Sequence, residues 1–177
     1  MKPFDVCELG RMILISFEQK IDGKRLDVEF ECDEDNMYVL ADRDAIHQIL
    51  YNICDNAVKF ASEGGRLRMS FTWSAPEMNL NRHRKAVVQV FNEGQGIPPE
   101  DIPFVFERFY KSDKSRGLDK TGVGLGMFIS KTIIEAHGET ISVESEYGRS
   151  CTFTFTLART EPPSQKSRAI HIQGGNP

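Results

Sequence analysis

The sequence lacks a long hydrophobic run and an N-terminus of the signal-peptide type. Its longest largely apolar run, 12–17, has six residues, whereas a membrane-spanning helix needs roughly 20. We therefore expect a soluble, cytoplasmic chain that makes no direct membrane contact itself, whether or not a parent protein is anchored in a membrane.

An excess of basic residues is also missing. Lys and Arg number 22 against 26 Asp and Glu, so the formal net charge is −4. Proteins that are held on nucleic acid mainly by phosphate contacts carry the opposite charge. The composition therefore argues against a nucleic-acid partner.

Cysteine is scarce, and its spacing excludes two further classes. Cys7, Cys32, Cys54 and Cys151 form no CxxC pair, so neither a zinc site nor a disulfide scaffold is indicated. Hydrophobic residues make up 40% of the chain and charged residues 27%, which is typical of a globular protein and not of a disordered one. We expect reduced cysteines in one globular core.

Hydrophobic periodicity predicts an α+β fold. Alternating apolar and polar residues predict about six strands, paired as hairpins, over 26–32, 37–40, 67–73, 86–92, 140–146 and 150–157. Apolar residues at helical spacing predict helices over 5–21, 42–61 and 125–136. Because helices and strands do not alternate strictly, we expect a mixed, mostly antiparallel sheet of five or six strands with about three helices on one face.

The helix expected over 42–61 carries two asparagines on one face. Gln48, Asn52, Asn56 and Lys59 are three or four residues apart, so they share a face beside an apolar stripe. Asparagine is a mediocre helix former, and an amide oxygen can ligate a hard cation such as Mg²⁺. The segment alone fits two solvated asparagines as well.

Two glycine clusters have the local context of ligand sites. Residues 92–97 follow a predicted strand directly, where Gly94 and Gly96 allow a sharp turn and a close approach of backbone to ligand. Residues 121–126 precede a helix, whose free N–H groups and dipole favour an anion. A simple turn at the first cluster, and a solvated charged stretch over 111–120 beside a hinge at the second, remain open alternatives.

Three familiar nucleotide-binding patterns are absent. The sequence has no GxxxxGK followed by Ser or Thr, so it has no P-loop. The glycines of 92–97 lead to Pro98, and those of 121–126 follow no predicted strand, which excludes a Rossmann unit. The HRD, DFG and APE motifs of eukaryotic-type protein kinases are missing too. A nucleotide site here would be of another type.

Four short motifs occur in a fixed order along the chain. They are Asn52-x-x-x-Asn56-Ala57-x-Lys59-Phe60, Asn92-x-Gly94-x-Gly96-Ile97-Pro98, Phe106-Glu107-Arg108-Phe109-Tyr110 and Gly122-x-Gly124-Leu125-Gly126. Together they resemble the catalytic, ATP-binding domain of bacterial two-component sensor histidine kinases. The resemblance covers about 24–157 and implies a Bergerat α/β sandwich.

The resemblance also implies a division of the chain. Residues 24–158 would form the catalytic domain. Residues 1–23 would form a helix and linker that lead from a missing dimerisation and histidine phosphotransfer domain, so that this chain is a fragment. Residues 159–177 would form a flexible tail.

Roles for individual residues follow from the same resemblance. Asn56 would ligate Mg²⁺, with Asn52 supporting the metal or its waters. Lys59 and Arg108 would reach toward phosphate and, with Asn52, would be the catalytic residues. The positions implied to bind ATP are Asn52, Asn56, Lys59, Phe60, Asn92, Gly94, Gly96, Ile97, Phe109, Tyr110, Lys111, Thr121, Gly122, Val123, Gly124, Leu125 and Gly126.

Asn92 departs from the family pattern. The family has an Asp at this position, which accepts a hydrogen bond from the adenine amino group. An amide oxygen can still accept that bond, but a bond to a neutral group is weaker than one to a charged group. We expect ATP binding to be weaker by on the order of 1 kcal/mol.

The resemblance implies phosphoryl transfer in place of hydrolysis. Related ATPases carry a Glu at the position of Asn52 to activate water, and an amide cannot accept that proton. The γ-phosphoryl group would go to a histidine of the parent's phosphotransfer domain, and then to an aspartate of a response regulator receiver domain. None of the chain's histidines lies in the acceptor motif; they are His47, His83, His137 and His171.

Two other functions fit the same motifs. An anti-sigma-factor type of serine kinase shares them, although the Phe106 to Tyr110 motif favours the histidine kinase. A nucleotide-binding module without catalysis is the second alternative, because Asn92 replaces the Asp.

Overall fold

Seven strands form two sheets in the part of the chain that this computed structural model describes, residues 1–75, 84–111 and 124–163. The five-stranded sheet has the order β2-β4-β5-β7-β6, and the two-stranded sheet pairs β1 with β3. The strands are β1 (Lys2–Asp5), β2 (Asp27–Cys32), β3 (Tyr38–Ala41), β4 (Arg66–Trp73), β5 (Lys85–Glu93), β6 (Ile141–Glu146) and β7 (Ser150–Ala158).

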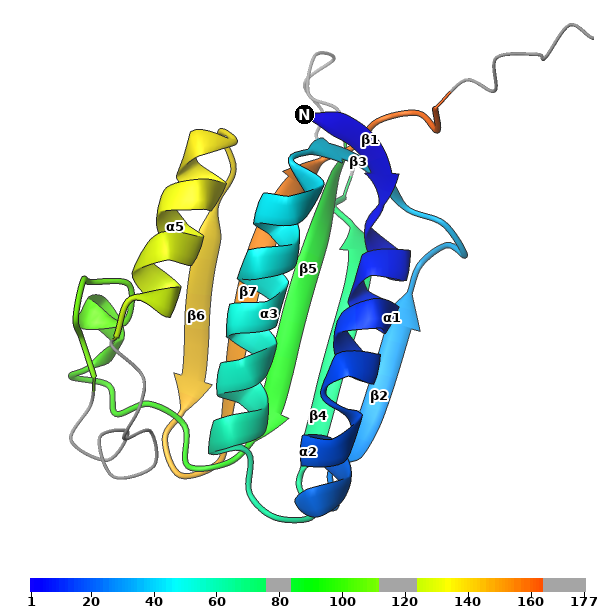
Figure 1. Ribbon diagram of the computed structural model, residues 1–177. Coiled ribbons are helices and arrows are strands. Elements are labelled where there is room, and N and C mark those ends of the chain that lie inside the picture. Colours follow the sequence, from blue (N-terminus) through cyan, green and yellow to red (C-terminus); the bar gives the residue numbers. More distant parts are fainter. Residues whose placement is uncertain (76–83, 112–123, 164–177) are drawn as a thin grey trace, which may run out of the picture.

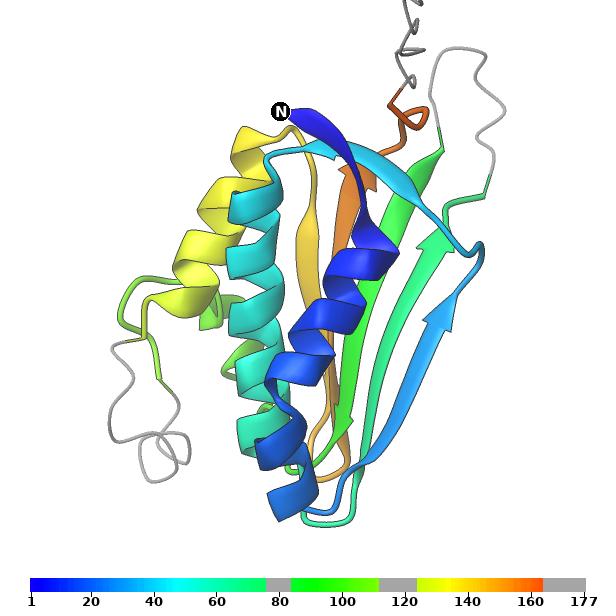
Figure 2. The ribbon, with the colours of Figure 1, turned by 45° about the vertical axis from the view of Figure 1, so that its right-hand side comes forward.

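Helices cover one face of the five-stranded sheet (Figure 1). They are α1 (Val6–Ser16), α2 (Glu18–Gly23), α3 (Arg43–Phe60) and α5 (Gly126–Ala136), with a short 3-10 helix η1 (Ile102–Phe104). Figure 2 shows the resulting two layers, helices on one side and the sheet on the other. The α+β prediction, with helices on one face of a mixed, mostly antiparallel sheet, is confirmed.

The expected pairing of the first two strands as a hairpin is wrong. β2 runs parallel to β4, from Asp27 opposite Arg66 to Cys32 opposite Phe71. β3 instead pairs antiparallel with β1, outside the main sheet. Alternation along a strand reports which face is buried but not which strand lies beside it, so the sequence pattern did not reveal this crossover.

The single helix expected over 5–21 is divided into two helices, α1 and α2, which follow β1. The chain leaves helical geometry at Phe17, whose ring is buried. α1 lies very close to the sheet, because a Cβ atom at Gly10 would stand 2.3 Å from the Phe71 ring. Its buried residues, Val6, Cys7, Leu9, Gly10 and Ile13, join the same core as α3 and the sheet.

Side chains satisfy backbone groups at both ends of α3. Asp42, directly before the helix, caps its N-terminus, and Lys24, from a distant segment, caps its C-terminus. The Asp42 carboxylate accepts hydrogen bonds from the Asp44 and Ala45 backbone N–H groups, a standard N-cap. At the other end the Lys24 ammonium donates to the carbonyls of Val58, Lys59 and Ala61 at 2.8, 2.6 and 3.0 Å. Because the last carbonyls of a helix have no partner within it, Lys24 supplies the missing donors.

The four cysteines are free thiols. Burial raises the pKa of Cys54 and of Cys151 to about 12, because a low-polarity surrounding disfavours the thiolate. In the three described ranges, no helix combines the length and the apolar character that crossing a bilayer requires.

Candidate nucleotide-binding site

The asparagine-bearing face of α3 lies against the beginning of α5. The side-chain Nδ2 of Asn52 donates to the carbonyl of Gly126, 3.4 Å away. A Cβ atom at Gly126 would lie 3.6 Å from Asn52 Cγ, an ordinary contact distance. Asn56 is one turn further along α3 and shares this face. The structure therefore brings the first asparagine motif and the last glycine motif together, as Figure 1 shows for the two helices.

Lys59 forms an ion pair on its own helix. Its ammonium lies 3.2 Å from the Asp55 carboxylate, which also pairs with Lys20 at 3.3 Å. Both side chains of the Lys59–Asp55 pair are 27% exposed. The predicted contact of Lys59 with phosphate would compete with this pair and stays a prediction.

The first glycine motif begins with a buried amide at the end of β5. Asn92 is 4% exposed and stands opposite Leu67 of β4 and Cys151 of β7. Residues directly opposite in neighbouring strands share a face, so all three side chains point toward the helical layer. The Asn92 Nδ2 is buried and has no hydrogen-bond partner among the described residues.

Gly94 lies against the end of α3. A Cβ atom there would stand 2.2 Å from the Phe60 carbonyl oxygen and 3.2 Å from Asn92 Nδ2. Gly94 also forms an isolated antiparallel bridge with Ala61. Only glycine fits here without displacing backbone, so Phe60, Asn92 and Gly94, which the sequence predicted as site residues, are close together.

The rest of the first glycine motif is held by Ser145 of β6. Gly96 has a φ of +67°, a conformation that favours glycine. The Ile97 backbone N–H donates to the Ser145 hydroxyl at 2.8 Å, and that hydroxyl donates to the Ser150 carbonyl at 2.8 Å. Ser145 could not be predicted as a site residue from the sequence, because a serine in an alternating strand belongs to no motif.

Glu93 fixes the motif from the opposite face of the sheet. Its carboxylate accepts the Arg66 backbone N–H at 3.0 Å and lies 2.8 Å from the Arg66 guanidinium. The backbone bond, followed by the bond to the guanidinium, holds the pKa of Glu93 below its usual value. The hydrogen bond from the Arg66 backbone and the ion pair with its guanidinium therefore hold the end of β5 in place, just before the glycines.

The Phe106 to Tyr110 motif is joined to the second glycine motif. Phe109 donates its backbone N–H to the Gly124 carbonyl at 2.9 Å. Both residues have positive φ values, 61° for Phe109 and +74° for Gly124, and a Cβ atom at Gly124 would stand 2.9 Å from the Phe109 backbone. The Tyr110 ring packs at a tilt on Phe104, with 6.1 Å between centroids.

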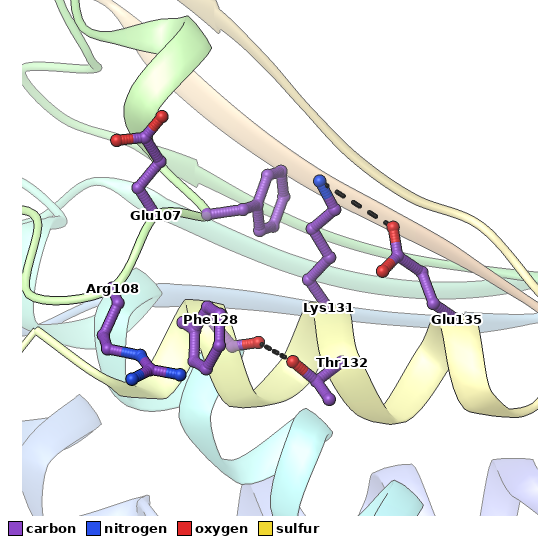
Figure 3. Close-up of a pocket in the computed structure, with 7 residues that line it drawn as sticks. Glu107, Arg108, Phe128, Lys131, Thr132 and Glu135 are labelled. Atoms are coloured by element: carbon purple, nitrogen blue, oxygen red, sulfur yellow. Dashed lines mark hydrogen bonds and ion pairs between the residues drawn. The ribbon is translucent and has the colours of Figure 1, made fainter.

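Arg108 lies over an aromatic ring. Its guanidinium is 4.7 Å from the centroid of the Phe128 ring of α5. The two residues border a cavity of about 440 Å³, shown in Figure 3, which is lined by Phe106, Glu107, Arg108, Phe128, Lys131, Thr132 and Glu135. Figure 3 also shows the ion pair of Lys131 with Glu135, at 3.7 Å, on the exposed side of α5. The predicted contact of Arg108 with the γ-phosphate stays a prediction.

Part of the predicted site lies outside the described residues. This holds for Thr121, Gly122 and Val123, and for most of the charged stretch that was expected to lie beside them. The described positions of the second glycine motif are Gly124, Leu125 and Gly126, of which Gly126 contacts Asn52. Lys111 is half-buried at the edge of the described part.

The chain matches a known protein family over most of its length. Residues 41–161 match the model of the histidine kinase-, DNA gyrase B-, and HSP90-like ATPases. The sensor histidine kinase WalK of Bacillus subtilis is 40% identical over 126 residues, which are 71% of this chain and 20% of WalK. The sensor protein SrrB of Staphylococcus aureus is 34% identical over 147 residues, 83% of this chain and 24% of SrrB. The chain thus spans about a quarter or less of the length of these relatives.

Solved structures of sensor kinases share the fold. The catalytic domain of histidine kinase ThkA has a TM-score of 0.74 and 30% identity, covering 90% of this chain and 98% of that domain. Full-length ShkA in complex with AMPPNP has a TM-score of 0.73 and 25% identity, covering 92% of this chain and 32% of ShkA. ThkA in complex with the response regulator TrrA has a TM-score of 0.70 and 29% identity, covering 90% of this chain and 42% of ThkA.

The four motifs, the helical layer on a mixed sheet and these comparisons agree with one another. The resemblance to the catalytic, ATP-binding domain of sensor histidine kinases is confirmed, and with it the Bergerat-type sandwich. This chain belongs to the family of histidine kinase-, DNA gyrase B-, and HSP90-like ATPases.

Proposed function

We propose that this chain binds Mg-ATP and transfers the γ-phosphoryl group to a histidine of a phosphotransfer domain in a two-component sensor kinase. The single observation that carries the proposal is the contact of Asn52 with Gly126, which joins the asparagine face of α3 to the glycine segment before α5. The likeness of the chain to histidine kinase catalytic domains supports it, as does the AMPPNP bound by ShkA.

The donor atoms near α3 fit magnesium in the presence of phosphates. Among the described residues, no three His, Cys, Asp or Glu side chains form a group that could hold a metal ion. Mg²⁺ commonly takes one or two protein oxygens and completes its shell with phosphates and water. Asn56, with Asn52 one turn away, would supply amide oxygens, and the metal would neutralise phosphate charge there.

The purine would occupy the space beside Asn92. This amide is buried, and its Nδ2 lacks a partner in the described part of the chain, which is rare for a native polar group unless a ligand or water completes it. A purine edge that offers hydrogen-bonding atoms would supply the missing partner.

The chain's own residues favour transfer over hydrolysis. Asn52 cannot take a proton from water at neutral pH, so it would orient groups without acting as a general base. Positioning and charge neutralisation supply most of the catalysis of phosphoryl transfer. Lys59 and Arg108, if they left Asp55 and Phe128, would bring positive charge to the phosphates.

The acceptor would come from another domain. His137 is not available as a nucleophile, because Nε2 accepts the Asp42 backbone N–H at 3.2 Å and Nδ1 lies 2.7 Å from the Ile133 carbonyl. We propose that residues 1–23 lead from a dimerisation and histidine phosphotransfer domain, that 24–158 act as the catalytic domain and 159–177 as a tail. A response regulator would be the second partner, as TrrA is for ThkA.

A phosphotransfer assay tests the proposal. The full 177-residue chain is incubated with Mg²⁺, ATP labelled at the γ-phosphate, and a histidine phosphotransfer domain from a related sensor kinase. We expect label on that domain that is lost in acid and retained in alkali, as a phosphohistidine requires. The matched control is the same domain with its acceptor histidine replaced by glutamine, which should stay unlabelled.

Other outcomes identify the alternatives. Acid-stable label on a serine would support the anti-sigma-factor type of kinase and overturn the histidine assignment. ATP binding measured by calorimetry, without transfer to any of several phosphotransfer domains, would support a non-catalytic module. If the chain did not bind ATP at all, the proposed nucleotide site itself would be contradicted.

A further inference from the structure

Among the described residues, none accepts a hydrogen bond from the nitrogen of the Asn92 side chain. Its Nδ2 is buried and donates to no acceptor among the described residues, and the residue as a whole is 4% exposed. A buried amide is normally held in one orientation by the hydrogen bonds of its nitrogen and oxygen. Because no such bond holds Nδ2 in the described part of the chain, a turn of 180° about the last side-chain bond would exchange donor and acceptor without changing the shape of the group.

We propose that Asn92 makes the nucleotide site tolerant of the group at purine position 6, so that 6-oxopurine nucleotides such as those of inosine bind as well as adenine nucleotides. This inference rests on the proposed function, because it places the purine beside Asn92. It concerns which purine the site accepts, and not whether the site binds nucleotide.

The hydrogen-bonding pattern of the two purines supports the inference. Adenine offers an amino donor at position 6 next to an acceptor at N1, and a 6-oxopurine offers the reverse, an acceptor at position 6 next to N1–H. An amide carries one acceptor and one donor, so it can turn its oxygen to the amino group of adenine or its nitrogen to the oxygen of a 6-oxopurine. A carboxylate has acceptors only, and would face the oxygen of a 6-oxopurine with a second acceptor.

The residues opposite Asn92 on the two neighbouring strands carry no charge. Leu67 is apolar, and Cys151 stays a neutral thiol because burial raises its pKa to about 12. Glu93, the adjacent charged residue on the strand, points to the other face of the sheet and is bound by Arg66. None of these three residues therefore sets the choice between the two purines.

Calorimetry with two diphosphates tests the inference on the unmodified chain. ADP and IDP differ only at positions 1 and 6 of the purine, so their affinities compare those positions directly. With Mg²⁺ present, we expect the Kd of IDP to lie within about tenfold of that of ADP. ADP binding with IDP more than tenfold weaker would overturn the inference and leave the proposed function standing, whereas binding of neither would overturn both.

Two variants sharpen the comparison. Asn92→Asp should raise the ratio of the IDP Kd to the ADP Kd at least about tenfold, because the side chain then has only acceptors.

Gln89→Glu is the matched control. It makes the same change from amide to carboxylate on the same strand but on the opposite face, where Gln89 donates to Thr154. Its ratio of the two Kd values should equal that of the unmodified chain. Circular dichroism checks that both variants fold. If Asn92→Asp folds and its ratio of the IDP Kd to the ADP Kd is unchanged, the inference is contradicted. If Asn92→Asp does not fold, the measurement on the unmodified chain decides the inference.

Discussion

Gly94 and Phe60 approach each other so closely that no side chain fits between them. A Cβ atom at Gly94 would stand 2.2 Å from the Phe60 carbonyl oxygen, and the neighbouring Ala61 bridges to Gly94. The last turn of α3 and the first glycine motif are therefore in direct backbone contact. A displacement of either would move the asparagines of α3 relative to Asn92.

Replacing Gly94 by alanine should disturb both the stability and the site. The added methyl group has to push the Phe60 backbone away, and overpacking of this kind costs about 1–3 kcal/mol. Gly126→Ala is the matched control, because its Cβ atom would meet Asn52 Cγ at an ordinary 3.6 Å. Urea denaturation should show the loss for Gly94→Ala and less than about 1 kcal/mol for Gly126→Ala. Equal stability of the two variants would argue against the close contact.

Asn56→Ala should abolish Mg²⁺-dependent ATP binding while the fold is retained. The substitution removes the amide oxygen that would ligate the metal. Of the two asparagines proposed for the metal site, Asn52 would then remain. Isothermal titration with and without Mg²⁺ measures the effect, and circular dichroism measures the fold. The amide of Asn36 is exposed, and Asn36→Ala should bind ATP as the unmodified chain does. If Asn56→Ala bound ATP in the presence of Mg²⁺ as tightly as the unmodified chain, Asn56 would not be a metal ligand.

The parts of the site that lie on one element could be predicted from the sequence. Asn52 and Asn56 share a face because their spacing matches the helical repeat, and α3 extends over Arg43–Phe60 much as expected. The glycines at 94 and 96 stand at a strand end, where a turn was expected. Local periodicity and turn chemistry were sufficient for these features.

The contacts between distant segments could not be predicted in the same way. Lys24 caps α3 across 34 or more positions of sequence, and Ser145 holds Ile97 across 48. Neither residue type is unusual in its local pattern, so only the folded arrangement reveals the role. The parallel pairing of β2 with β4 is hidden for the same reason, since its partner strand is not the next in sequence.

Lys24→Met should destabilise the chain by about 2 kcal/mol, because three helix-end carbonyls lose a charged donor. Methionine keeps most of the length and apolar volume of the side chain, so the change isolates the ammonium. Lys20→Met is the control, since the Lys20 side chain is 61% exposed and makes one ion pair, with Asp55, and exposed pairs contribute only about 0–1 kcal/mol. Chemical denaturation measures both. A loss for Lys24→Met no larger than that for Lys20→Met would show that water replaces the cap.

The pair of Glu93 with Arg66 should make stability depend on pH in the acid range. The pKa of Glu93 is lowered in the folded chain, so on acidification the unfolded chain takes up this proton first. The stabilising contribution is therefore complete above the unfolded glutamate pKa, about 4.3, and is lost as the pH falls through the folded value. Glu93→Gln keeps an acceptor for the Arg66 N–H but cannot titrate, so its stability should fall less between pH 7 and pH 3.

Urea denaturation at those two pH values measures the effect as a difference between proteins. The unmodified chain should be more stable than Glu93→Gln at pH 7, and the gap should narrow toward pH 3 as the carboxylate is protonated. Glu144→Gln, at an exposed position of β6, provides the control for removing one acidic charge without removing the bonds to Arg66. If Glu144→Gln and Glu93→Gln both lost less stability than the unmodified chain between pH 7 and pH 3, and to the same extent, the effect would come from net charge and not from the ion pair. Because Glu93 directly precedes Gly94, we expect the end of β5 to loosen in acid and the affinity for ATP to fall with it.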